Sequence, residues 1–213
     1  MNPVARWLST WWLNRMASVA VLFDRKSQAI ASLRKIIEID SRNEMARAAI
    51  GNLYAEEGDQ AAALKEFLAL VELNPRNAEA WFNLGYIYDQ RDELENAERC
   101  FRKAVELRPS IDRAWYGLGL VLVRQRRLGE AIDAFRRTIK LQSMSPYGYY
   151  QLGMTYHHLG RNESAAKVYE ALKKFEPRYA ATLKRDMEIT VPQALDLESP
   201  EPSSKEGTET ESI

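Results

Sequence analysis

Two consecutive stretches of equal length decide the fold: AEAWFNLGYIYDQRDELENAERCFRKAVELRPSI, residues 78–111, and DRAWYGLGLVLVRQRRLGEAIDAFRRTIKLQSMS, residues 112–145. When they are aligned, Trp81 matches Trp115 and Phe101 matches Phe135, at a constant separation of 34 residues. The same step, without insertion or deletion, reaches backward to Gly51, Tyr54, Ala63, Phe67 and Pro75 and forward to Tyr149, Leu152, Gly153, Tyr156, Ala165, Tyr169 and Pro177. A fixed period of this length indicates a stack of equivalent structural units.

Each unit has the pattern of two helices. Trp81, Leu84 and Tyr88 are spaced as one stripe of a first helix. After the polar break DQRDE, Ala97 and Phe101 begin the stripe of a second helix. Proline cannot continue a helix, and it recurs where second helices should end, at Pro75, Pro109 and Pro177. The sequence therefore predicts helical hairpins.

A glycine recurs inside the first helix of successive units, at Gly51, Gly85, Gly119 and Gly153. Glycine costs about 1 kcal/mol relative to alanine in a helix interior, so its recurrence needs a packing reason. We expect close approach of the paired helix at its small residues, namely Ala63, Ala97, Ala131 and Ala165.

The repeat resembles the tetratricopeptide repeat (TPR) family. In residues 78–111, the eight signature positions of that family are filled by Trp81, Leu84, Gly85, Tyr88, Ala97, Phe101, Ala104 and Pro109. The resemblance implies stacked helical hairpins that form a right-handed superhelix with a concave, partner-binding groove.

The predicted fold is an all-α solenoid of about five stacked helix-turn-helix units with a capping helix and a tail. The units are 10–43, which is degenerate, 44–77, 78–111, 112–145 and 146–179. Residues 180–189 should form a capping helix whose outer face, with Asp186, meets water. Residues 190–213 are acidic, lack aromatic residues and should be disordered.

The opening segment, MNPVARWLSTWWLNRMASVAVLF, holds three of the five tryptophans. Arg15 divides its apolar residues into runs too short for a transmembrane helix and interrupts the apolar region that a signal peptide needs. We interpret residues 10–23 as the first helix of the degenerate unit and residues 1–9 as an amphipathic extension. Trp7 and Trp11 share its apolar arc. Such an arc needs a partner: a neighbouring subunit or this chain's own groove first, a membrane surface second.

Composition narrows the function. The formal net charge is zero, and the acidic tail leaves only about +5 on the other residues, too mild and scattered for a nucleic-acid partner. Cys100 is the single cysteine, so no internal disulfide can form. The adjacent His157 and His158 would point about 100° apart on a helix and cannot ligate one metal as an i, i+4 pair can. No phosphate-binding loop or nucleophile motif occurs. We expect a chain with no enzymatic activity, no cofactor and no metal site.

The family resemblance places partner contacts on the concave face. Carried over by position, the candidate groove residues are Asn52, Phe82, Asn83, Tyr86, Arg113, Tyr116, Arg124, Tyr147, Tyr150 and His157. Tyrosine and arginine are enriched in binding hot spots. Asn52, Asn83 and Arg113 fall on positions with which chaperone-binding members hold a terminal carboxylate, but Ala48 and Gly117 stand where that clamp needs cations. We therefore favour an apolar-aromatic or helical peptide as the ligand.

These observations predict a cytoplasmic scaffold or adaptor that binds a peptide or partner helix in the groove of a TPR superhelix. Self-association through the N-terminal helix is a further expectation. The alternative is an assembly scaffold that lies on the cytoplasmic face of a membrane and is docked through its Trp-rich N-terminal helix.

Overall fold

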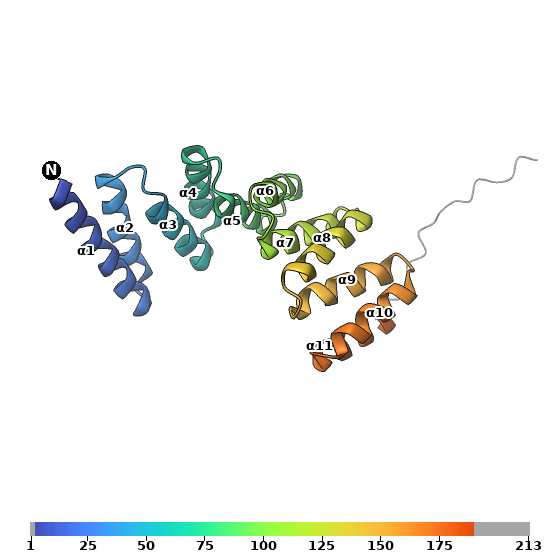
Figure 1. The fold of residues 1–213 in the computed structure, drawn as a ribbon. Helices are drawn as coiled ribbons and strands as arrows, with labels where there is room; N and C mark the ends of the chain where they lie inside the picture. Colours follow the sequence, from blue (N-terminus) through green and yellow to red (C-terminus); the bar gives the residue numbers. More distant parts are fainter. Residues whose placement is uncertain (1–2, 190–213) are drawn as a thin grey trace, which may run out of the picture.

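The computed structural model describes residues 3–189, which form eleven α-helices and no strand (Figure 1). The helices are α1 Pro3–Leu22, α2 Lys26–Ile39, α3 Glu44–Glu57, α4 Gln60–Leu73, α5 Ala78–Gln90, α6 Leu94–Leu107, α7 Asp112–Arg124, α8 Leu128–Leu141, α9 Pro146–His158, α10 Asn162–Lys173 and α11 Pro177–Ile189. They lie in chain order along a curved row. The expected all-α solenoid is confirmed, whereas the expected disordered tail, residues 190–213, lies outside the described residues. None of the described helices is long and apolar enough to cross a bilayer.

The first ten helices form five hairpins, here called units 1 to 5. The turn of each hairpin contains one residue with positive φ, and these residues recur every 34 positions: Asp24, Gly58, Asp92, Arg126 and Gly160. The next amide donates to a carbonyl five residues earlier, as from Asp59 N to Tyr54 O at 2.9 Å. This is the Schellman helix ending, in which a left-handed residue lets the chain reverse. Unit 1 has the same turn, with Arg25 N donating to Ala20 O at 2.7 Å.

The recurring glycines face aromatic rings. A Cβ added at Gly51, Gly85 or Gly119 would lie 2.9, 2.9 or 2.5 Å from a ring carbon of Phe67, Phe101 or Phe135, respectively. The paired helix thus approaches closely at these glycines, and the nearest side chains there are phenylalanines rather than the alanines named from the sequence. The three phenylalanines are fully buried, and each ring can lie flat against the first helix only because the glycine there has no side chain. At Gly153, the close neighbour is instead Leu183 Cδ2 of α11, at 2.7 Å.

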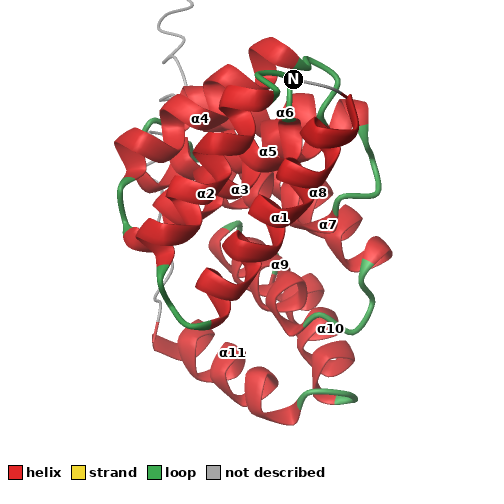
Figure 2. Cartoon of the chain, turned by 90° about the vertical axis from the view of Figure 1, so that its left-hand side faces the viewer, coloured by secondary structure: helices red, strands yellow, loops and turns green. Residues whose placement is uncertain are grey.

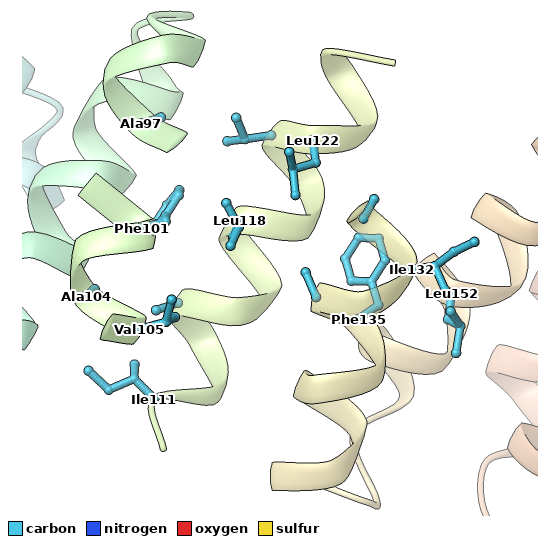
Figure 3. Close-up of a cluster of buried hydrophobic side chains, with 14 of the residues drawn as sticks. Ala97, Phe101, Ala104, Val105, Ile111, Leu118, Leu122, Ile132, Phe135 and Leu152 are labelled. Carbon is cyan, nitrogen blue, oxygen red and sulfur yellow. The ribbon is translucent and has the colours of Figure 1, made fainter. Parts of the chain in front are cut away.

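One hydrophobic cluster runs through units 3 to 5. Phe101 of α6 points toward α7, where Leu118 and Leu122 lie (Figure 3). Phe135 of α8 lies in the same cluster as Leu152 of α9. Each second helix thus fills the space between its own first helix and the first helix of the next unit. Because no unit covers its own apolar face, stacking supplies the stability of the array.

Arginines at one position of the second helix link several units to their successors. A guanidinium stands at this position in units 1, 3 and 4 and reaches a side chain of the next unit. The contacts are Arg34 Nη2 to the Tyr54 hydroxyl at 2.8 Å, Arg102 Nη2 to Glu130 Oε2 at 2.7 Å and Arg136 Nη2 to the Tyr156 hydroxyl at 2.6 Å. In unit 2, the equivalent residue is Leu68.

The junction between units 2 and 3 is therefore more open. A cavity of about 720 Å³ lies there, with Leu68 of α4, Trp81 and Tyr88 of α5 and Cys100 of α6 in its lining. Within residues 3–189, no ion pair joins these two units. Burial raises the pKa of the Cys100 thiol to about 11, which keeps it protonated and unreactive at neutral pH.

The junction between units 3 and 4 carries an ionic network instead. Glu98 Oε2 lies 2.8 Å from Arg127 Nη1, and both Arg102 and Arg127 also pair with Glu130. Burial acts to raise the pKa of Glu98, but hydrogen bonds from Arg102, Gln125 and Arg127 outweigh it and hold the pKa below its usual value. Hydrogen bonds from the two arginines likewise lower the pKa of Glu130.

The ends of the array are formed by α1 and α11. From Pro3 onward, the amphipathic extension expected before residue 10 is part of one helix, α1, which is anchored where Arg6 Nη2 donates to Ile39 O of α2 at 2.8 Å. At the other end, α11 begins at Pro177 and not at residue 180, because proline fits the first turn of a helix. Asp186 does not lie on the outer face but accepts a hydrogen bond from the Tyr150 hydroxyl at 2.7 Å.

Candidate functional site

The odd-numbered helices line the inner side of the curve. From α5 to α11 they approach one another directly, in addition to packing on the even-numbered helices between them. Elements on the inner side of a bent row must lie closer together than those on the outer side. The candidate groove residues therefore belong to α3, α5, α7 and α9, as the family resemblance requires.

Five of these residues surround one hollow of about 310 Å³ between α3, α5 and α7. They are Asn52, Phe82, Asn83, Tyr86 and Arg113. Asn83 Nδ2 donates to Asn52 Oδ1 at 3.3 Å across the junction of units 2 and 3. The Arg113 guanidinium carbon lies 4.8 Å from the centre of the Phe82 ring, a cation–π geometry that limits the motion of the arginine.

Tyr86 is the exposed aromatic of this hollow. Its side chain is 49% exposed although α5 is otherwise well packed, with Leu84 and Ile87 buried. An exposed tyrosine beside two carboxamides and a guanidinium offers apolar area together with hydrogen-bonding groups. This combination is suited to a peptide.

Capping contacts hold α3 and α5 in place beneath the hollow. The side chain of Asn77 accepts a hydrogen bond from Ala80 N at 3.0 Å, which fixes the first turn of α5. Its amide also donates to Glu44 Oε2 at 2.9 Å, and Asn74 Nδ2 donates to Glu44 Oε1 at 2.9 Å. Glu44 is the first residue of α3, so one carboxylate ties the starts of the two helices together.

A second group of candidate residues lies where α7, α9 and α11 meet. Tyr147 is 55% exposed, and its ring centre lies 5.4 Å from that of Tyr179, edge to face. Tyr116 is half-buried with its ring 5.9 Å from Phe135, and burial raises its pKa although a hydrogen bond with Gln151 opposes the shift.

Tyr150 also belongs to this second group but is engaged within the chain. Burial, followed by its hydrogen bond to Asp186, raises the pKa of Tyr150 to about 12. The same bond lowers the pKa of Asp186. Much of the Tyr150 side chain is thus used to dock α11 against α9.

Arg124 and His157 lie away from both groups. Arg124 Nη1 pairs with Asp89 Oδ1 at 2.6 Å, and its Nη2 contacts Asp92, so this guanidinium links units 3 and 4. His157 lines a separate hollow near α10 and α11. Within residues 3–189, no three histidine, cysteine, aspartate or glutamate side chains are grouped as a metal site.

Two residues of the second group, Tyr179 and Asp186, were missed from the sequence. The 34-residue register ends at residue 179, so most of α11 has no repeat partner that marks the roles of its residues. Only the tyrosine itself, two residues after a helix-starting proline, could have drawn attention to the first turn of α11.

A family model describes such an array. The model of the cilia and flagella-associated protein 70 C-terminal domain, a TPR domain, matches residues 8–194, which include all of the helices from α2 to α11. The chain belongs to this TPR family. No curated protein sequence matches it.

Several solved TPR structures share the fold. The MamA protein superposes with a TM-score of 0.73 at 23% identity, over 86% of this chain and 97% of that one. PilF of Pseudomonas aeruginosa gives a TM-score of 0.70 at 20% identity, over 86% and 88% of the two chains. YrrB, described as a TPR protein with an unusual peptide-binding site, gives 0.69 at 21% identity, over 81% and 90%. At these identities the likeness shows the fold alone.

The structure shows what surrounds the two positions at which the clamp of chaperone-binding TPR proteins needs cations. Gly117, at one of the positions where a cation is needed, would place a Cβ 2.7 Å from Phe101 Cζ. A basic side chain cannot be accommodated there without displacing a buried ring. Ala48, at the other position, packs against the unit 2 core. Of the clamp positions, Asn52, Asn83 and Arg113 remain.

Proposed function

We propose that this chain is a non-enzymatic scaffold that binds a peptide or partner helix in the hollow between α3, α5 and α7. The observation that carries the proposal is the convergence of Asn52, Asn83, Tyr86 and Arg113 around that hollow. Membership of a TPR family supports the general class, because such repeats serve as protein-interaction scaffolds.

The chemistry of the hollow favours recognition of main chain and one apolar side chain. A carboxamide presents both a donor and an acceptor, which match the C=O and N–H of a peptide bond. Asn52 and Asn83 already face each other at 3.3 Å and can exchange that contact for two contacts to a ligand. A hollow of about 310 Å³ accommodates little more than one large side chain beside Tyr86.

Arg113 supplies a single cation at the edge of the hollow. Its Nη2 lies 3.7 Å from Glu79 Oε2, so an acidic ligand group would compete with an existing exposed ion pair. One cation of this kind adds little affinity for a terminal carboxylate. We therefore expect apolar and main-chain contacts to dominate binding. The described peptide-binding site of YrrB supports a peptide as the ligand class.

The experiment uses random peptides displayed on phage and selected on the full chain. Selected peptides are then titrated by fluorescence anisotropy against the wild type, Tyr86→Ala and Asn52→Ala/Asn83→Ala. Loss of a hot-spot residue should weaken binding by about 30-fold or more. Met45→Ala, which changes an 84% exposed side chain on the same layer, is the matched control. Peptides that bind Tyr86→Ala as tightly as wild type, or that bind only through Tyr147, would overturn the assignment of this hollow.

A further inference from the structure

The outward face of α1 is apolar and uncovered. Trp7 is 65% exposed and Trp11 is 51% exposed, and neither lines the groove hollow. The chain's own groove, one of the occupants expected from the sequence, therefore does not hold these tryptophans. Viewed from the N-terminal end of the array, α1 lies in front of the other helices (Figure 2). Its opposite face packs on α2 through Leu13, Ala17 and Ala20.

Six of the exposed residues of α1 form a regular stripe. Its positions are separated alternately by four and three residues: Val4, Leu8, Trp11, Arg15, Ser18 and Leu22. This is the spacing of a helix that packs along its length against another helix. Trp7, Trp12 and Val19 flank the stripe. Seven apolar side chains of the stripe and its flanks are between 44% and 79% exposed, and three of them are tryptophans. Such large aromatic side chains supply much of the ~800 Å² that each partner contributes to a standard protein interface.

We propose that α1 pairs antiparallel with α1 of a second copy of this chain, so that the array is a two-fold symmetric dimer. In an antiparallel pair centred near residue 13, Val4 meets Leu22, Leu8 meets Ser18 and Trp11 meets Arg15 of the other copy. The small Ser18 leaves room for Leu8, and the two apolar ends of the stripe, Val4 and Leu22, cover each other.

The second half of the stripe is already hollowed. A depression of about 370 Å³ is lined by residues of α1 that include Trp11, Arg15, Ser18 and Leu22. In the antiparallel pair, this depression receives Leu8 and Trp7 of the second copy. A parallel pair would instead stack each tryptophan on its own equivalent and leave both depressions empty.

Arg15 distinguishes a protein partner from a membrane. It lies in the middle of the apolar stripe, where insertion into lipid would carry a guanidinium toward the acyl chains. In the antiparallel pair the same guanidinium lies over the indole of Trp11 of the second copy, a favourable cation–π contact. A membrane surface, the second possible partner expected from the sequence, therefore fits the stripe less well than a second copy of the chain.

End-to-end stacking of arrays fits less well too. The outward residues of α11 include Arg178, Lys184, Arg185 and Glu188, all exposed and charged. An apolar α1 stripe placed against that face would remove these charges from water, including the Lys184–Glu188 and Arg185–Asp186 pairs, and would offer them no new partner. The stripe is instead complementary to itself, and self-complementary surfaces give closed dimers.

Sedimentation equilibrium of the full chain over a wide concentration range tests the pairing. We expect twice the 24.5 kDa chain mass for the wild type. Leu8→Glu should weaken dimerisation about 100-fold, whereas Met45→Glu, on an exposed site outside α1, should leave it unchanged. Circular dichroism melts show whether each variant stays folded.

A compensating variant tests the register. In the antiparallel pair, Leu8→Glu combined with Ser18→Arg places each new carboxylate beside a new guanidinium of the other copy, so dimerisation should return. The two positions are ten residues apart and cannot pair within one helix. A wild-type monomer, a dimer indifferent to Leu8→Glu, concentration-dependent growth beyond a dimer, or a monomer that sediments with phosphatidylcholine–phosphatidylserine vesicles through Trp7 would each overturn the proposal.

Discussion

Gly119 and Gly129 should respond to the same substitution with opposite signs. A Cβ at Gly119 would lie 2.5 Å from Phe135 Cε1 and 2.8 Å from two further ring carbons. Phe135 is fully buried, so the ring can move only by displacing its neighbours. Overpacking of this kind costs about 1–3 kcal/mol, against about 1 kcal/mol gained in helix propensity. Gly119→Ala should therefore lower the free energy of unfolding by roughly 1 kcal/mol.

Gly129 supplies the matched control. It lies in the first turn of α8, and a Cβ there would have no neighbouring atom within 4 Å. Gly129→Ala should raise the free energy of unfolding by about 0.5–1 kcal/mol, since only the propensity term operates. Urea unfolding followed by both circular dichroism and tryptophan fluorescence measures the difference, provided that the two transitions coincide.

A double-mutant cycle identifies the ring as the cause. In a Phe135→Leu background the added methyl has more room, so Gly119→Ala should lose most of its destabilising effect. If Gly119→Ala were as stabilising as Gly129→Ala, the close approach of helix and ring could not be the reason for the recurring glycine.

Two further predictions concern the turns and the ionic network. Arg126 has a φ of 62° at the position where Gly58 and Gly160 stand in other units. In thermal melts, Arg126→Gly should therefore stabilise the fold by about 0.5–1 kcal/mol, whereas Gly58→Ala should destabilise it. If both variants changed the stability in the same direction, backbone strain at Arg126 would be contradicted. The pKa of Glu98 is below its usual value in the folded chain, so its stabilisation is present above about pH 4.5 and is lost as the pH falls through the folded value. Glu98→Gln should lower the melting temperature near neutral pH but flatten its decline between about pH 5 and pH 3, and an unchanged slope would exclude the carboxylate as a source of acid sensitivity.

The fold could be predicted because several positions in every repeat specify the two helices and the faces that they bury. Trp81, Leu84 and Phe101 fix the helices and their faces, and a shift of one residue would expose them all. The same pattern did not show what Gly85 packs against, because small residues recur at alanine and glycine positions alike. Only the positions of the helices in space show that Phe101 fills that gap.

The candidate site was predictable residue by residue but not as an arrangement. Asn52 and Asn83 come together because two first helices approach on the inner side of the curve. Arg124 also stands at a position that the family resemblance assigns to the groove, but it is held by acidic residues of the preceding unit. Tyr150 is engaged by α11, a helix beyond the last repeat. Whether a groove residue is engaged by a residue of an adjacent unit depends on the curvature of the array, and the sequence of a single repeat does not specify that curvature.

Leu68 stands in unit 2 where units 1, 3 and 4 have an arginine that contacts the next unit. The junction after unit 2 should therefore be less stiff than the other junctions of the superhelix. Two guanidinium–carboxylate contacts, Arg102 with Glu130 and Arg127 with Glu98, join units 3 and 4, whereas across the preceding junction Leu68 leaves a gap. Bending will therefore concentrate at one joint. Asn52 and Asn83 span that joint on its inner side, so a ligand bridging them would set its angle. A bound partner would then change the pitch of the whole array as well as occupy part of it.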